Sequence, residues 1–206
     1  MTTRCACTVE HPPRLVVVTG GPGAGKSAVL EAVPYELCQH VVVLPEAAGI
    51  LDRGRFPRHA TTSARRALQR AIARLQIEMQ RMTIEEGHAA LILCDRGTLD
   101  GIAYWPGDER DYFSELDTNR DRELARYAAV IQLRSPTAEY GYRSEPHRPE
   151  SATEAAAIDE RITHAWAGHR NHYLVDADVD FLVKLRRTIE LIRAEVPACC
   201  RTMLAA

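Results

Sequence analysis

The feature that most constrains this chain is an apolar run that leads directly into a glycine-rich loop. Residues 14–19 read Arg-Leu-Val-Val-Val-Thr, and such a β-branched stretch is typical of a buried strand. Glycines follow at positions 20, 21, 23 and 25, and residues 28–37 continue as a helix-like segment. A strand, a tight loop and a helix in this order predict the first unit of an α/β fold with a mainly parallel sheet.

The loop over residues 20–27, which we call the P-loop, has the spacing G-x-x-x-x-G-K-[ST]. Its glycines permit the backbone angles and the close approach that let successive N–H groups point at phosphate oxygens. The N-terminus of the helix that follows also favours an anion. We therefore expect a nucleoside triphosphate to be bound by Gly21, Pro22, Gly23, Ala24, Gly25, Lys26, Ser27 and Ala28.

Two side chains of the P-loop complete the predicted nucleotide site. The Lys26 ammonium can reach the terminal phosphates, and the Ser27 hydroxyl is the kind of hard oxygen ligand that Mg²⁺ prefers. Both roles suit ATP or GTP bound together with Mg²⁺, and they are typical of phosphoryl transfer. The alternative is a glycine-rich turn without a ligand, which the preceding buried strand disfavours.

Four further apolar runs predict the rest of the sheet. They cover residues 40–44, 89–94, 128–133 and 173–175, with helix-like segments between them. Because a strand–helix–strand crossover is right-handed, this alternation predicts a mainly parallel sheet with helices on both faces. The predicted fold class is therefore α/β, with helices and sheet in a three-layer sandwich.

Three helices are predicted from their periodicity and end signals. Residues 61–86 carry one apolar stripe that we expect to face the core, although the length of the helix also allows a homodimer. Residues 151–170 begin with Ser151 and Glu154 at the capping-box spacing, and the last helix covers residues 179–195. The apolar stripe consists of Leu68, Ile72, Leu75, Met79 and Met82.

Length and charge restrict the class of protein. With 206 residues and a net charge of −2, the chain can form one domain and has no overall positive field to attract nucleic acid. We assign residues 14–196 to that domain and expect flexible ends over residues 1–13 and 197–206. No apolar run approaches the ~20 residues of a membrane-spanning helix. The N-terminus carries no secretion signal, so we expect a cytoplasmic protein.

The six cysteines are spread over the sequence without a C-x-x-C pair. This spacing argues against a structural zinc site and against a disulfide framework. Cys94 lies in an apolar run and is expected in the core, whereas Cys5, Cys7, Cys199 and Cys200 lie near the ends of the chain. We therefore expect free thiols.

Polar residues after the third predicted strand form a second candidate element. Asp95 follows residues 89–94 and should reach the carboxyl edge of the sheet, where the P-loop also lies. There it can bind Mg²⁺ or accept a proton, and the alternative is a cap for the next helix. Arg96 can neutralise charge on a transferred phosphoryl group or form a surface salt bridge. Asp100 and Tyr104 either line an acceptor pocket or only cap and pack.

Glu46 and a long loop complete the candidate residues. Glu46 follows the predicted strand over residues 40–44, and at the same edge it can act as a general base for an acceptor hydroxyl. Its alternative role is a favourable negative charge in the first turn of the next helix. Residues 134–150 lack apolar periodicity, and we expect this segment to be a lid. Its arginines are Arg134, Arg143 and Arg148.

These motifs, in this order, resemble the P-loop nucleoside and nucleotide kinase superfamily. The chain is most similar to AAA-type ATPase and kinase-like domains related to nicotinamide riboside kinase, and more distantly to deoxynucleoside and thymidylate kinases. The resemblance spans residues 14–195 and implies the P-loop NTPase sandwich, a five-stranded parallel sheet of order 2-3-1-4-5 with a lid. It rests on the P-loop, Pro45-Glu46-Ala47-Ala48, Asp95-Arg96-Gly97 with Asp100 and Tyr104, and residues 140–145.

The resemblance also implies roles for single residues. Glu46 would serve the acceptor, Asp95 and Arg96 would serve the metal and the phosphates, and Arg143 would act from the lid. Asp-Arg-Gly stands where deoxynucleoside kinases have Glu-Arg-Ser, which leaves the identity of the acceptor open.

The sequence as a whole predicts a Mg²⁺-dependent phosphotransferase that moves a phosphoryl group from ATP or GTP to a small nucleoside- or nucleotide-like acceptor. The alternative is a regulatory switch that binds and hydrolyses the nucleotide without a small-molecule acceptor. The predicted catalytic residues are Lys26, Glu46, Asp95, Arg96 and Arg143, and the predicted metal ligands are Ser27 and Asp95.

Overall fold

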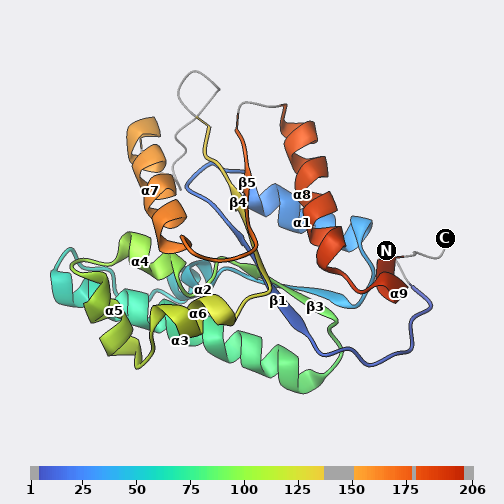
Figure 1. Ribbon diagram of the computed structural model, residues 1–206. Helices are drawn as coiled ribbons and strands as arrows, with labels where there is room; N and C mark the ends of the chain where they lie inside the picture. Colours follow the sequence, from blue (N-terminus) through green and yellow to red (C-terminus); the bar gives the residue numbers. More distant parts are fainter. Residues whose placement is uncertain (1–4, 137–150, 178–179, 202–206) are drawn as a thin grey trace.

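The computed structural model of the chain describes residues 5–136, 151–177 and 180–201. Within these residues, five strands form one parallel sheet in the order β2-β3-β1-β4-β5, which confirms the predicted topology (Figure 1). Each strand overlaps the apolar run that predicted it. The strands are β1 (Arg14–Thr19), β2 (Val41–Leu44), β3 (Leu91–Asp95), β4 (Ala129–Leu133) and β5 (His172–Val175).

The register of the central strands brings the carboxyl ends of β1 and β3 together. Val18 of β1 stands opposite Asp95 of β3, and the Arg96 N–H extends this ladder by donating to the Val18 carbonyl oxygen at 3.1 Å. Because the strands are parallel, the segments that follow β1, β2 and β3 meet at one edge of the sheet. This edge therefore holds the P-loop next to Asp95 and Arg96.

Helices cover both faces of the sheet and build two separate cores, which confirms the three-layer sandwich (Figure 1). Val16 and Val18 pack with α1 (Lys26–Glu36) and α8 (Phe181–Glu195), whereas Val17 packs with α7 (Ala152–Ala165) on the opposite face. This division follows from the alternation of side chains along a strand. The other helices are α2 (Ala47–Arg53), α3 (Thr62–Glu86), α4 (Asp100–Tyr104), α5 (Glu109–Leu116), α6 (Arg120–Ala125) and α9 (Ala198–Arg201).

The buried face of α3 is not the predicted apolar stripe. Met82 of the stripe is 54% exposed, and the remaining stripe residues are only partly buried. The buried residues of α3 are instead Gln69, Ala73, Gln76, Gln80 and Thr83. In the interior, Gln80 Nε2 donates to the Tyr127 hydroxyl at 3.1 Å, while Gln80 Oε1 has no partner among the described residues. The predicted core-facing stripe was therefore wrong for most of its length, since only Met79 of the stripe is among the residues packed against a core, and Leu68 and Ile72 line a cavity.

The start of α7 agrees with the predicted capping signal, whereas its end differs from the predicted one. The predicted capping box is present, since Ser151 Oγ accepts from the Glu154 N–H at 3.3 Å and the Ser151 N–H donates to Glu154 Oε2 at 2.8 Å. The helix ends at Ala165, earlier than predicted, and Gly168 follows with a φ of 89°. Among the described helices, none has the length and apolar character needed to cross a membrane.

Candidate functional site

The P-loop turns sharply between β1 and α1. Gly20, Gly23 and Gly25 have φ angles of 143°, 74° and 93°, in the region that favours glycine. A Cβ atom at Gly20 would lie 2.1 Å from the Leu133 carbonyl oxygen, so a larger residue cannot fit there. Residues 22–28 line a cavity of about 720 Å³. The loop thus presents its backbone and the first residues of α1 to this cavity.

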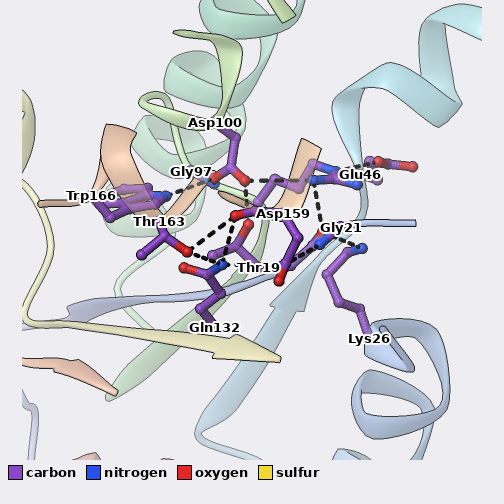
Figure 2. Close-up of polar contacts among 12 residues, drawn as sticks. Thr19, Gly21, Lys26, Glu46, Gly97, Asp100, Gln132, Asp159, Thr163 and Trp166 are labelled. Carbon is purple, nitrogen blue, oxygen red and sulfur yellow. Dashed lines mark hydrogen bonds and ion pairs between the residues drawn. The ribbon is translucent and has the colours of Figure 1, made fainter. Parts of the chain in front are cut away.

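The Lys26 side chain folds back over its own loop. Its Nζ donates to the Gly20 carbonyl oxygen at 3.1 Å (Figure 2). Burial lowers the pKa of Lys26 to about 8, and the positive charge of Arg96 acts in the same direction, against the attraction of Asp95 and Glu46. An anion in the cavity would favour the charged ammonium. The environment of Lys26 therefore suits a phosphate.

Asp95 lines the cavity and carries a carboxylate oxygen that has no partner among the described residues. Its Oδ1 is buried, and no group of the described residues donates a hydrogen bond to it. Burial raises the pKa of Asp95 to about 6, although Lys26 opposes the shift. Ser27 lines the same cavity, so a hydroxyl and a carboxylate suited to Mg²⁺ share one space. The alternative role of Asp95, a cap for the next helix, is not seen, because the N-cap of α4 is Leu99 and no side chain caps it.

Arg96 connects three segments that surround the cavity. Its Nε donates to Glu46 Oε1 at 2.8 Å, and its Nη1 donates to the Gly20 carbonyl oxygen at 3.2 Å. Nη1 also lies 3.5 Å from Asp100 Oδ1, and the guanidinium lies 5.7 Å from the centre of the Tyr104 ring. The Arg96 side chain is only 13% exposed. The Glu46 side chain is 37% exposed, so the arginine end of the ion pair is buried while its carboxylate end lies at the cavity.

Glu46 reaches the cavity from the start of α2. It occupies the N-cap position, but its side chain makes no capping hydrogen bond. Burial raises the pKa of Glu46, yet the charge and the hydrogen bond of Arg96, together with Lys26, outweigh burial and lower the pKa overall. The side chain therefore presents a charged carboxylate, held by Arg96, at the wall of the cavity.

Asp100 is enclosed by the protein and does not line the cavity. It is 2% exposed and accepts hydrogen bonds from the Thr19 hydroxyl, the Gly97 N–H and the Trp166 indole N–H (Figure 2). Tyr104, in contrast, lines the cavity. The two residues therefore differ in their surroundings, since Asp100 is buried in a hydrogen-bond network while Tyr104 contacts the open space.

A second polar network, centred on Asp159, attaches the P-loop to α7. Asp159 is 2% exposed, and its Oδ1 accepts from the Gly21 N–H and from Gln132 Nε2, both at 3.1 Å (Figure 2). Its Oδ2 pairs with Arg134 Nε at 3.0 Å. Asp159 was not among the predicted site residues, because it lies 138 residues from Gly21 and resembles any acidic residue of a helix.

The segment predicted as a lid begins beside the P-loop. Ser135 Oγ donates to the Pro22 carbonyl oxygen at 2.9 Å. Arg134 is bound to side chains of α7 and does not line the cavity. Arg143 and Arg148 lie outside the described residues.

The far end of the cavity lies between α2, α3 and α4. Leu68 and Ile72 of α3 and the ring of Tyr104 contribute apolar surface. Asp52 and Arg58 contribute an ion pair, with Arg58 Nε 3.1 Å from Asp52 Oδ1. Mixed walls of this kind, in a cavity of this size, are typical of small-molecule sites.

Comparison of the sequence with protein-family models identifies the family of the chain. A model described as an AAA domain matches residues 15–181, which is more than half of the chain. The chain belongs to this AAA domain family. The matched part of the chain contains the P-loop, Glu46, Asp95, Arg96 and Asp159. No curated protein matches the chain.

Solved structures with the fold of this AAA domain include two proteins of low sequence identity. Thymidylate kinase from Candida albicans superposes with a TM-score of 0.63 and 13% identity, over 95% of this chain and 96% of that one. The NadR protein in complex with NR gives a TM-score of 0.67 and 12% identity, over 91% of this chain and 52% of that one. The AAA domain thus shares the fold of both and spans about half of the NadR chain.

Proposed function

We propose that this AAA domain is a Mg²⁺-dependent phosphotransferase that moves the γ-phosphoryl group of ATP or GTP to a small nucleoside- or nucleotide-like acceptor. The observation that carries the proposal is a continuous cavity that runs from the P-loop to the apolar residues of α3. A donor and an acceptor held at its two ends would be brought together in a fixed orientation, which removes much of the entropic barrier to reaction.

The donor site would be formed by the P-loop. Backbone N–H groups of residues 22–28 and the N-terminus of α1 would bind the phosphates, and the Lys26 ammonium would exchange its bond to the Gly20 carbonyl oxygen for a phosphate oxygen. The hydrogen bond from the Gly21 N–H to Asp159 would keep the P-loop in place when the nucleotide binds. These contacts suit either purine triphosphate, because they involve only the phosphates.

The metal site would be formed by Ser27 and Asp95. Asp95 Oδ1 supports this role because it is a buried acceptor without a partner in the described chain, and a cation would supply the missing interaction. The bound Mg²⁺ would offset charge on the β- and γ-phosphates. Ser27 would contribute the second oxygen, which leaves the remaining positions to water and phosphate, as Mg²⁺ prefers.

Arg96 and Glu46 would act on the reacting groups together. Arg96 carries a fixed positive charge beside the P-loop, where charge develops on the transferred group. Glu46 is ionised and can accept a proton from an acceptor hydroxyl, and its bond to Arg96 would fix its position. Asp95 is the second candidate for this proton. A role for Arg143, a homodimer and a cytoplasmic location stay predictions from the sequence.

The acceptor would occupy the space beside Leu68, Ile72 and Tyr104. Two apolar side chains and a ring suit the flat face of a base, while Gln69 and Arg58 offer polar groups to its edge or to a sugar. Thymidylate kinase and the NadR protein in complex with NR share the fold, and their names support an acceptor of this class.

Transfer of label tests the proposal. The purified chain would be incubated with ATP or GTP labelled in the γ-phosphoryl group and with a panel of nucleosides, nicotinamide riboside and nucleoside monophosphates. A labelled acceptor, absent with Lys26→Ala, is the expected result. Slow release of labelled phosphate with every acceptor would instead support the regulatory switch, and the Ser135 contact with the P-loop is the place where a nucleotide could affect the segment that follows.

A further inference from the structure

Five of the six cysteines, together with two histidines, gather at the edge of the sheet opposite the P-loop. They come from the segment before β1, from the turn between α1 and β2, and from α9, which lies beside the N-terminal segment (Figure 1). Cys5, Cys38 and Cys200 are buried, at 7%, 3% and 2% exposure. The predicted flexibility of the chain ends stays a prediction, but these two ends contribute buried residues to a common cluster.

The seven side chains divide into two groups that share Cys200. The inner group contains Cys5, Cys38, His40 and Cys200, and the outer group contains Cys7, His11, Cys199 and Cys200. In each group, the four potential ligand atoms lie within 4.8 Å of one another. Each group therefore offers three sulfurs and one imidazole nitrogen, a common ligand set of structural zinc.

The nitrogen–sulfur distances in both groups are close to those expected around a tetrahedral metal ion. In the inner group, His40 Nδ1 lies 3.3 Å from Cys5 Sγ and 3.6 Å from Cys200 Sγ. In the outer group, His11 Nε2 lies 3.3, 3.2 and 3.7 Å from the sulfurs of Cys7, Cys199 and Cys200. Zinc bonds of ~2.3 Å to sulfur and ~2.0–2.1 Å to nitrogen give a tetrahedron with nitrogen–sulfur edges of ~3.5–3.6 Å.

Hydrogen bonds alone do not account for this arrangement. One imidazole nitrogen either donates one proton or offers one lone pair, yet three sulfurs surround His11 Nε2. A metal ion at the centre of the tetrahedron would instead contact all four atoms at once.

We propose that the chain binds two zinc ions in a structural centre bridged by the Cys200 thiolate. The inner ion is held by Cys5, Cys38, His40 and Cys200, and the outer ion by Cys7, His11, Cys199 and Cys200. A thiolate sulfur has lone pairs for two metals, and soft sulfur with imidazole selects zinc over Mg²⁺ or Ca²⁺. Because all four positions of each ion are filled by protein atoms, the centre is structural and not catalytic.

Backbone contacts hold the ligands of the inner ion in place. The Cys5 N–H donates to Gln39 Oε1 at 3.0 Å, which fastens the N-terminal segment to the turn before β2. The His40 carbonyl oxygen accepts from the N–H groups of Ala90 and Leu91 at 2.8 and 3.2 Å, which ties this turn to β3. Such outer contacts orient metal ligands.

The centre is an addition to the family domain. Cys5, Cys7, His11, Cys199 and Cys200 all lie outside residues 15–181, the range that the AAA domain model matches. Zinc would connect the two segments that flank the domain to each other and to the sheet, as a substitute for a larger apolar core at this edge.

Metal analysis of the full-length chain, purified without a histidine tag under reducing conditions, tests the proposal. Elemental analysis should find about two zinc ions per chain, and replacement by Co²⁺ should give the intense visible and thiolate charge-transfer bands of tetrahedral sulfur-bound cobalt. Cys5→Ser should lose the inner ion and Cys199→Ser the outer ion, each leaving about one zinc ion per chain, while Cys200→Ser should leave less than one.

Two variants serve as matched controls. Cys94→Ser changes the cysteine that belongs to neither group, and His88→Ala changes an exposed histidine, so both should keep the zinc content of the unchanged chain. One zinc ion or none in the unchanged chain, with free thiols or disulfides in their place, would overturn the proposal. The measurement on the unchanged chain decides the matter even if a variant fails to fold.

Discussion

The guanidinium of Arg96 and the carboxylate of Glu46 form an ion pair at 2.8 Å between residues 50 positions apart in the sequence. Arg96 follows β3 and Glu46 follows β2, so the pair joins the carboxyl ends of two neighbouring strands. The same guanidinium donates to the Gly20 carbonyl oxygen of the P-loop. Arg96 thereby joins Glu46 to the P-loop, the donor site of the proposed reaction.

Glu46→Gln tests Glu46 as the proton acceptor. Since the amide keeps the shape but cannot take a proton, transfer to the acceptor should fall at least ~100-fold while the Kd for ATP stays within about twofold. Glu31→Gln, at another carboxylate that lines the cavity, is the matched control and should retain activity. Equal activity of Glu46→Gln and the unchanged chain would remove Glu46 from the mechanism.

Asp95→Asn tests the metal site. The change removes a buried carboxylate whose Oδ1 lacks a partner, so without Mg²⁺ the thermal midpoint should stay the same or rise by about 2–4 °C. The gain in nucleotide affinity on adding Mg²⁺ should shrink by about tenfold. Asp52→Asn, at an acidic residue of the same cavity, should keep that gain. An unchanged dependence on Mg²⁺ in Asp95→Asn would contradict the assignment.

Asp159→Ala tests the support of the P-loop by α7. Loss of the carboxylate leaves the Gly21 N–H and Arg134 without their buried acceptor, and should cost about 2–3 kcal/mol of unfolding free energy. Nucleotide affinity should fall by about tenfold, because the loop loses a fixed point. Glu160→Ala removes the next acidic residue, which is exposed, and should have little effect in urea unfolding or in nucleotide titration. Equal effects of both variants would refute the role of Asp159.

Glu123 should make stability depend on pH. Burial raises its pKa, but hydrogen bonds from Arg126, Thr98 and Thr118 outweigh burial and lower the pKa below the ordinary value of 4.5. A lowered pKa in the folded state means that the stabilisation is complete above pH 4.5 and is lost as pH falls through the folded pKa.

Glu123→Gln should therefore cost about 1–3 kcal/mol near pH 7, and the difference from the unchanged chain should shrink below about pH 4.5. Urea unfolding at a series of pH values measures this. Asp121→Asn, at an exposed residue of the same helix, should change stability by less than about 0.5 kcal/mol at every pH. A constant difference for Glu123→Gln down to pH 3 would exclude the ionised group as the cause.

The sequence predicted those parts of the fold that depend on local signals. The valine-rich run of β1, the glycines of the P-loop and the capping box of Ser151 each act within a few residues, and each is present in the structure. The order of the sheet was predicted from the resemblance, and the alternation of strands and helices agrees with it.

Contacts between distant segments could not be predicted in this way. Gln80 of α3 is buried and donates a hydrogen bond to Tyr127, which lies far along the chain. Apolar periodicity in the sequence cannot reveal such a pair. The contact of Asp159 with the P-loop could not be predicted for the same reason. The cysteine and histidine groups could not be predicted either, because they form only where the two ends of the chain lie together. The positions of Glu46 and Arg96 at one edge were predictable, but their ion pair was not.

Calorimetric titration with ATP and GTP, in the presence and absence of Mg²⁺, tests the central claim most directly. The account predicts saturable heat for at least one triphosphate with about one site per chain, an affinity at least ~10-fold weaker when Mg²⁺ is removed, and no heat with folded Lys26→Ala. Absence of Mg²⁺-dependent heat with both triphosphates would contradict the account.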